Sequence, residues 1–254
     1  MSEIIALCGF AFLAGLVDAV AGGGGLIQVP ALFALFPNLP PSMLLGTNKF
    51  SSLAGTAIAT LRYSWSVQID WRRVIPAAAL AGAGALIGAK TVTLLDPTTL
   101  RPLLLLMLGI ITADTLLRRQ FGERGAALPV SDGSRAALFG VAAVFGFYDG
   151  FFGPGAGSLL MFVLVRWFGV DFLRAAATTK VLNVTTNFCA LMLFILTGNV
   201  LYTVAIPMAL LNVAGGYLGA HFAIRRGSRF IRGVFLIVVL SLLLKLVFDQ
   251  LRSL

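Results

Sequence analysis

The first half of the sequence recurs in the second half at a constant offset of 131 residues, without a gap. Over the 110 paired positions from Gly9 to Arg118, 19 residues are identical. Several matches involve residue types that are scarce in this chain, which makes chance agreement a poor explanation. These matches are Asp18 with Asp149, Lys49 with Lys180, Pro76 with Pro207 and Arg101 with Arg232. The sequence therefore predicts an internal duplication in which each copy is one structural unit.

Each copy contains four apolar segments. They cover residues 4–36, 42–62, 74–95 and 101–118 in the first copy, and 136–166, 175–197, 200–221 and 232–249 in the second. A helix needs about 20 residues to cross the hydrocarbon core of a bilayer, so the last three segments of each copy fit one crossing apiece. Hydrophobic residues make up 59% of the chain and charged residues 11%, against about 45–50% and about 25% in soluble domains. This composition excludes a soluble globule and a disordered chain, and it predicts an all-α polytopic membrane protein.

The opening segment of each copy is too long for one crossing and is interrupted by glycine. The interruptions are residues 22–25 in the first copy and 153–157 in the second. Glycine costs about 1 kcal/mol inside a helix and proline about 3. We therefore expect two half-helices that meet at a break.

The basic residues favour a hairpin for these half-helices. If the opening segment crosses once, the copies are parallel and the loop Lys and Arg residues divide 8 to 9 between the two sides. If it enters and returns, the copies are inverted and the division is 13 to 4. Basic loop residues concentrate on the cytoplasmic side. The sequence thus predicts two inverted four-segment repeats, residues 1–118 and 136–254, joined by a cytoplasmic linker at 119–135 into one transmembrane domain with both termini outside.

Other function classes find little support. The net charge of +9 comes from short basic groups between apolar segments, a pattern of membrane topology and not of nucleic-acid binding. Cys8 and Cys189 are isolated, and His221 is the only histidine. No metal site, cofactor or catalytic set is therefore expected, and the protein is not expected to be an enzyme. The chain also lacks a P-loop motif for ATP-driven transport.

Lys49 and Lys180 are the most specific candidates for a substrate site. They occur at matched positions inside apolar segments, in Thr47-Asn48-Lys49 and Thr178-Thr179-Lys180. A lysine at the centre of a membrane helix costs about 2.5–3.5 kcal/mol, so retaining two suggests that their charge binds an anion. Alternatively, each snorkels to the interface or acts as a topology signal. Asn183 and Asn187 share a helical face with Lys180, and that face either lines a polar cavity or joins helices.

Asp18 and Asp149 precede the two breaks by four residues. They can pair with the lysines, cap the broken helix ends or carry protons. The breaks themselves can offer free N–H groups and positive helix ends to an anion near the bilayer midplane, or they can permit close helix packing. The glycines concerned are Gly22, Gly24, Gly153 and Gly155. For the pairs Gly84/Gly88 and Gly215/Gly219 we expect packing.

The motifs resemble a known family. The run 15–25, followed by 45–49, is similar to the first repeat of the sulfite exporter TauE/SafE family. The run 146–157, followed by 179–183, is similar to its second repeat, in particular to the YfcA-like branch. The resemblance covers almost the whole chain. It implies a bacterial inner-membrane, multi-pass transporter of small anions such as sulfite or organosulfonates. Its signature falls on Asp18, Gly22, Gly24, Asn48, Lys49, Asp149, Gly153, Gly155, Lys180 and Asn183.

The combined prediction is a secondary transporter that moves a small anion, a sulfur-containing oxyanion or an organosulfonate, by alternating access. Lys49 and Lys180 supply charge, the half-helices supply N–H donors, and Asp18 or Asp149 supplies a proton route. The alternatives are an anion channel of the same fold and a non-transporting membrane scaffold or accessory subunit. The expected partners are the lipid bilayer, the anion and a coupling proton or ion. A homodimer is compatible with this prediction, and nucleic acid is not an expected partner.

Overall fold

The computed structural model describes residues 2–96, 98–100, 103 and 132–252. The elements among these residues are all helices. They are α1 (Ser2–Ala21), α2 (Gly25–Leu35), α3 (Pro41–Ser66), α4 (Trp71–Leu94), α6 (Asp132–Phe151), α7 (Ala156–Arg166), α8 (Phe172–Leu196) and α9 (Tyr202–Arg252). Except for Leu103, the predicted segment 101–118 lies outside the described residues, as does the linker up to residue 131.

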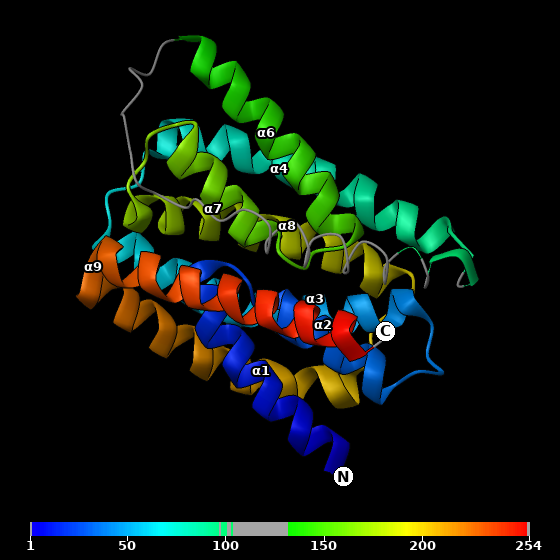
Figure 1. The fold of residues 1–254 in the computed structure, drawn as a ribbon. Coiled ribbons are helices and arrows are strands. Elements are labelled where there is room, and N and C mark those ends of the chain that lie inside the picture. Colours follow the sequence, from blue (N-terminus) through cyan, green and yellow to red (C-terminus); the bar gives the residue numbers. More distant parts are fainter. Residues whose placement is uncertain (1, 97, 101–102, 104–131, 253–254) are drawn as a thin grey trace.

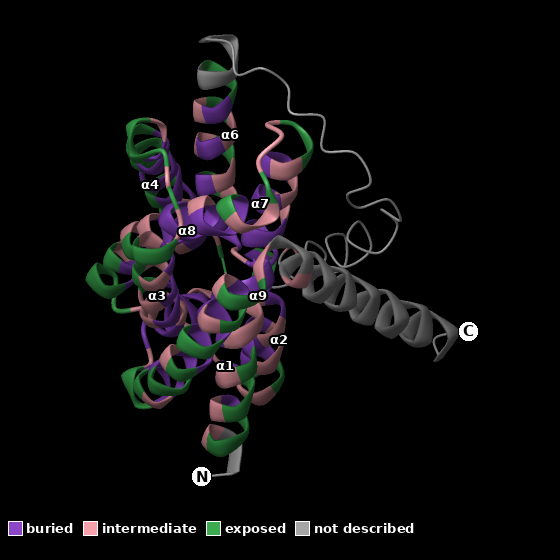
Figure 2. Cartoon of the chain, turned by 90° about the vertical axis from the view of Figure 1, so that its left-hand side faces the viewer, coloured by how far each residue is buried: buried purple, intermediate pink, exposed green. Residues whose placement is uncertain are grey.

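Among the described residues, four stretches are long and apolar enough to cross a membrane, namely Ile4–Ala21, Trp71–Leu94, Phe172–Leu196 and Tyr202–Gly227. Large apolar side chains on the outside of the helices are exposed, among them Ile75 at 60% and Leu210 at 66%, and Figure 2 shows such exposed faces around the molecule. Lipid can cover these faces. The architecture is that of a polytopic, all-α membrane protein, as the composition predicts.

Both opening segments consist of two helices separated by a break, as predicted. α1 and α2 are separated at Gly22–Gly24, and α6 and α7 at residues 152–155. Gly22, Gly153 and Gly155 have φ angles of 77°, 93° and 79°, a region that glycine enters without steric cost. The breaks are shorter than the glycine-rich runs, because Gly25 already belongs to α2 and residues 156–157 to α7.

Helices of one copy pack against helices of the other copy. α1 packs on α9 and α6 packs on α4, while α3 and α8 contact each other at the centre. Figure 1 shows α6 beside α4 in the upper half and α1 beside α9 in the lower half. At the offset of 131 residues, the α1–α9 pair corresponds to the α6–α4 pair. Each opening hairpin therefore packs on a helix of the other copy. The inverted orientation of the copies in a membrane remains a prediction.

Glycines make these helix contacts close. A Cβ atom on Gly84 would collide with the carbonyl oxygen of Ala143 in α6, and one on Gly215 would collide with that of Phe12 in α1. Gly88 and Gly219 face backbone carbonyls in the same way. The packing interpretation of these two glycine pairs is confirmed.

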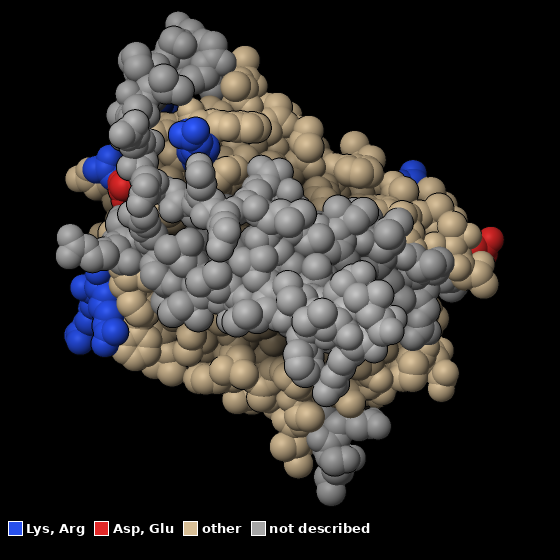
Figure 3. Space-filling view, viewed as in Figure 1, with Lys and Arg blue, Asp and Glu red and all other residues tan. Residues whose placement is uncertain are grey.

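Basic residues of the two copies meet at one end of the molecule. Arg62, near the end of α3, donates a hydrogen bond from Nη2 to Nδ1 of His221 in α9 over 2.7 Å. Its guanidinium also lies 4.5 Å from the ring centre of Tyr217. Figure 3 shows most of the Lys and Arg side chains on the visible face at the left end. In the inverted arrangement, the charge count assigns Arg62 and Arg225 to the same side of the membrane, and the contact between Arg62 and His221 agrees with this.

Two apolar clusters leave a polar layer between them. Along α3, Leu45 belongs to one cluster and Ala59 to the other; along α8, Leu182 belongs to one and Ala190 to the other. The residues between these positions include Lys49 and Asn187, which are buried. The polar layer therefore lies halfway along both central helices.

Candidate functional site

Both candidate lysines are buried, Lys49 within this polar layer and Lys180 at its edge, two residues before Leu182. The exposed fraction of Lys49 is 3% and that of Lys180 is 1%. Side chains that snorkel keep their ammonium groups in water. The burial therefore rules out the interpretation of these lysines as snorkelling residues in this structure.

Each lysine forms an ion pair with the aspartate of the other copy. Lys49 Nζ in α3 lies 3.0 Å from Asp149 Oδ1 in α6, and Lys180 Nζ in α8 lies 2.6 Å from Asp18 Oδ2 in α1. The aspartates were expected to pair with the lysines, to cap the broken helix ends or to carry protons. In this structure, both aspartates pair with a lysine. The pairing is exchanged between the copies, as the helix packing is.

The two ion pairs have different surroundings. Lys49 Nζ also donates to Asn187 Oδ1 at 2.9 Å, and the Thr186 hydroxyl donates to Asp149 Oδ2. Asp18 Oδ1 instead accepts a long hydrogen bond of 3.4 Å from the backbone N–H of Gly24, the residue that precedes α2. The position equivalent to Thr186 in the first copy is a glycine, Gly55. Each carboxylate is therefore held by a different set of donors.

A small polar cavity adjoins the pairs. Its volume is about 30 Å³, which is room for about two water molecules. Asn48 lines it, and Asn48 Oδ1 is buried without a hydrogen-bond partner among the described residues. The cavity is lined by Asp18, Gly22, Gly25, Asn48, Lys49, Ser52, Thr56, Asp149, Gly153, Gly157, Asn183 and Asn187.

The two helix breaks meet at this cavity. The Ser158 N–H of α7 donates to the Gly22 carbonyl at 3.1 Å, and its hydroxyl donates to the Ala21 carbonyl at 2.9 Å. The N–H groups of Gly24 and Ser158, at the starts of α2 and α7, are therefore bonded within the protein. This corrects the expectation that these two groups are free for an anion. Gly24 and Gly155 are also not among the residues lining the cavity.

The structure brings most, but not all, of the predicted residues together. Thr47 lies elsewhere: its hydroxyl donates to the Met43 carbonyl at 2.7 Å and accepts from the Leu201 N–H at 3.0 Å, which holds the start of α9. Thr178 is half-buried and also does not line the cavity. Asn183 and Asn187 do line it, although Asn187 bonds Lys49 of the other copy and not Lys180.

Sequence reasoning missed Gln28. This side chain in α2 is fully buried, and it donates to Ser51 Oγ at 3.0 Å and accepts from Ser52 Oγ at 3.3 Å. The equivalent residue in the second copy is Leu159, so comparison of the copies gave no reason to select it. A lone amide in an apolar half-helix was the available signal.

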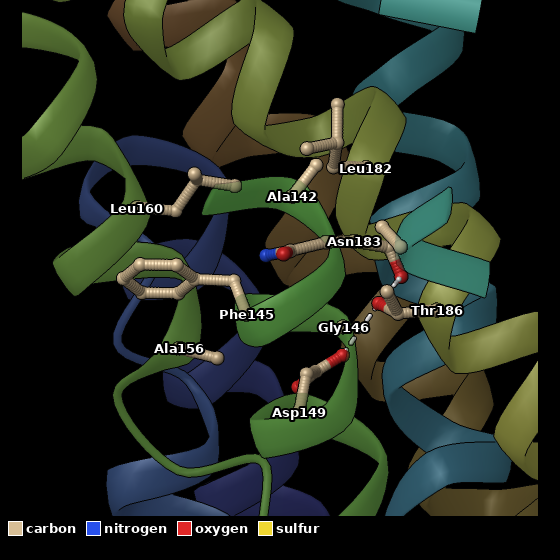
Figure 4. Close-up of a pocket in the computed structure, with 10 residues that line it drawn as sticks. Ala142, Phe145, Gly146, Asp149, Ala156, Leu160, Leu182, Asn183 and Thr186 are labelled. Atoms are coloured by element: carbon tan, nitrogen blue, oxygen red, sulfur yellow. Dashed lines mark hydrogen bonds between the residues drawn. The ribbon is translucent and has the colours of Figure 1, made fainter. Parts of the chain in front are cut away.

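A second pocket lies on the other side of Asp149, between α4, α6, α7 and α8, with a volume of about 10 Å³. Figure 4 shows Asp149 bonded to Thr186 at one end, and Phe145, Ala156 and Leu160 around the remainder. Within the described ranges, no three His, Cys, Asp or Glu side chains are grouped so that they could hold a metal ion.

Comparison with known proteins identifies the family of this chain. The family model of the sulfite exporter TauE/SafE matches residues 7–246. A probable membrane transporter protein, ORF9, from a Sinorhizobium species is 35% identical over 94% of this chain and 90% of its own length. A probable membrane transporter protein from Haemophilus influenzae is 33% identical over 94% and 92%. The probable membrane transporter protein YfcA from Escherichia coli K12 is 33% identical over 94% and 88%.

No solved structure matches the chain significantly. The matched family model spans both copies, including both helix breaks and both buried lysines. The family resemblance of the motifs is thereby confirmed. This chain belongs to the sulfite exporter TauE/SafE family of membrane proteins.

Proposed function

We propose that this protein is a secondary transporter in the bacterial inner membrane that moves a small anion, a sulfur-containing oxyanion or an organosulfonate, by alternating access. The observation that carries the proposal is the pair of buried lysines, each bound to an aspartate of the other copy beside a broken helix. The description of the family as a sulfite exporter and the names of its relatives as probable membrane transporters support this class of function.

The charges of the layer suggest how an anion binds. Two lysines and two aspartates sum to zero, so an added anion would leave an uncompensated negative charge in a buried site, which is costly. We propose that the anion takes the place of one carboxylate at its lysine while that carboxylate accepts a proton. The anion and the proton then enter the site together, and the buried layer remains neutral.

The same exchange links binding to movement. Each ion pair joins α1 or α6 of one copy to α3 or α8 of the other. When the anion replaces a carboxylate, the polar link between that helix hairpin and the opposite copy is lost. The hairpin can then shift, because the anion favours the conformation in which that link is open. Two such links, one for each helix hairpin, would provide the two states of an alternating-access cycle.

The test removes one lysine at a time. Charge-assisted hydrogen bonds contribute roughly 1.5–3 kcal/mol, so Lys49→Met or Lys180→Met should weaken anion binding by about 10- to 150-fold. Lys90→Met is the matched control, because Lys90 is exposed on α4 away from the pairs. Binding of sulfite and of small sulfonates to the purified protein is measured by calorimetry. Equal affinities in all three variants would show that the lysines do not bind the anion.

Transport itself is tested in liposomes. A carrier exchanges labelled substrate faster when unlabelled substrate is present on the opposite side, whereas an anion channel of the same fold does not. A protein without binding or flux would be a scaffold or accessory subunit. Trans-stimulated exchange is the result expected from alternating access.

A further inference from the structure

We infer that the two ion pairs are gates to opposite ends of the molecule. The pair of Asp18 with Lys180 controls access to the polar cavity from the end where Arg62 lies, and the pair of Asp149 with Lys49 controls access from the other end. This inference rests on the proposed function and assigns an end of the molecule to each of its two links. It is carried by the heights of the pairs along α3 and by the apolar cluster beside each pair.

The two lysines lie at different heights along α3. The Thr60 hydroxyl donates to the backbone carbonyl of Lys180 at 3.0 Å, so Lys180 is level with Thr60. Lys49 precedes Thr60 by 11 residues in the same helix, which is about 16 Å along the helix axis. Between these levels, Asn187 Nδ2 donates to Thr56 Oγ1 at 3.4 Å. The two ion pairs therefore lie on opposite sides of the contact between the central helices.

A different apolar cluster lies beyond each pair. The cluster at the end of α3 contains Tyr63 together with residues 19–21, the last residues of α1. The cluster at the start of α3 contains residues 44–45 together with residues 151–152, where α6 ends. Moving an ion through apolar side chains is costly. Each cluster therefore separates the polar cavity from one end of the molecule.

Each aspartate lies next to the part of its helix that packs in the nearer cluster. Asp18 directly precedes residues 19–21, and Asp149 precedes residues 151–152 by two positions. Loss of the Asp18 pair removes the polar link that holds the end of α1 in its cluster, and loss of the Asp149 pair does the same for the end of α6. Because α1 and α6 belong to different copies, one end can open while the other stays closed.

The gates differ in one neutral group. The Thr186 hydroxyl donates to Asp149 Oδ2, whereas the equivalent position in the first copy is Gly55. A Cβ atom on Gly55 would collide with the Asn212 side chain of α9, so this position excludes a threonine. Thr186 therefore stabilises only the gate at the end opposite Arg62.

The experiment measures how fast a thiol in the cavity reacts from each side of the membrane. Ser52 lines the cavity, so Ser52→Cys is the reporter, in a full-length protein in which Cys8 and Cys189 are changed to Ala. Sulfonatoethyl methanethiosulfonate, which does not cross membranes, is added to right-side-out or inside-out vesicles, and mass spectrometry measures the modified fraction. Ser66 and Asn38 are exposed on either side of α3, and Ser66→Cys and Asn38→Cys mark the two ends.

The two aspartate variants should open opposite ends. Asp18→Asn should raise the reaction rate only from the end where Arg62 lies, and Asp149→Asn only from the other end. A hydrogen bond to a charged group contributes roughly a factor of 10 to 150, and loss of the link raises the open population by that factor. The rates should rise accordingly. Asp70→Asn is the matched control, because Asp70 forms an exposed ion pair within α4 and its first turn, and it should change neither rate.

Two further variants leave no charge unpaired. Thr186→Val should raise the rate by about tenfold, and only from the end opposite Arg62. Thr185→Val is its control on the same helix, because the Thr185 hydroxyl bonds a carbonyl of α8 itself. The double variant Lys180→Met/Asp18→Asn should open the same end as Asp18→Asn, and it replaces that variant if the single change prevents folding.

Two results would overturn the gates. One is that the Asp18 and Asp149 variants react faster from the same side, and the other is that folded aspartate and Thr186 variants react at the rates of their controls. The thiol reaction needs no substrate, so these results do not depend on anion binding. Failure of sulfite and of every sulfonate to bind in calorimetry would overturn the proposed function instead.

Discussion

Lys180 Nζ lies 2.6 Å from Asp18 Oδ2, although 162 residues separate them in the chain. The Lys49–Asp149 pair repeats this relationship with the copies exchanged. Both lysines are almost completely buried. A buried ion pair adds little stability over a well-packed apolar pair, but loss of one partner leaves an uncompensated charge. Each lysine therefore depends on an aspartate of the other copy to compensate its charge.

The first prediction concerns this dependence. Lys180→Met should lower the free energy of unfolding by about 3–5 kcal/mol, because Asp18 is left without its cation. The double variant Lys180→Met/Asp18→Asn should recover most of that loss, since no unpaired charge remains. Unfolding of the detergent-solubilised protein followed by circular dichroism measures both values.

Lys90→Met provides the comparison, because Lys90 is exposed and should change stability by about 0.5 kcal/mol or less. If the loss in the double variant equals the sum of the losses in Lys180→Met alone and Asp18→Asn alone, the ion pair is not the interaction that holds Lys180.

The second prediction concerns helix contact. Gly215→Ala should destabilise the protein by about 1–3 kcal/mol, because overpacking forces the backbone to move and the new Cβ would collide with the Phe12 carbonyl. Gly140→Ala should be neutral or stabilising by up to about 1 kcal/mol through helix propensity, since nothing lies within 4 Å of its Cβ position. Equal effects of the two substitutions on thermal unfolding would contradict the close α1–α9 contact.

The third prediction concerns orientation in the membrane. The division of 13 to 4 among loop basic residues places the 118–135 connection in the cytoplasm and the C-terminus outside. The contact between Arg62 in α3 and His221 in α9 brings residues of both copies together, which agrees with this assignment. Reporter fusions at residue 254 and within 118–135 measure the sides. A cytoplasmic C-terminus would favour eight simple crossings and refute the inverted arrangement.

The fourth prediction concerns the cysteines. Cys8 and Cys189 are not equivalent positions, since their counterparts are Phe139 and Ile58, and both are partly buried free thiols. Each should act as a small apolar residue, so the double variant Cys8→Ala/Cys189→Ala should retain most of its transport in liposomes. Loss of transport in a folded, well-expressed double variant would instead indicate a thiol that reacts with substrate sulfur.

The sequence by itself determined that this is a membrane protein with an internal duplication and two helix breaks. It also determined the positions of Lys49 and Lys180 along their helices. These features follow from composition and from periodicity along one segment. Apolar excess demands lipid, glycine disfavours continuous helix, and equal spacing in two copies places equivalent side chains at equivalent heights. The packing role of Gly84 and Gly215 followed from the same local reasoning.

Only the tertiary structure decided which residues meet. The packing of helices from different copies determines the ion pairs Lys180–Asp18 and Lys49–Asp149 and the hydrogen bond from Lys49 to Asn187. It also determines that Thr47 lies outside the cavity. Spacing along one helix shows which face a side chain occupies, but it does not show which distant helix that face contacts. The difference between Thr186 and Gly55 is visible in the sequence, but its effect on Asp149 follows from the packing of α8 against α6.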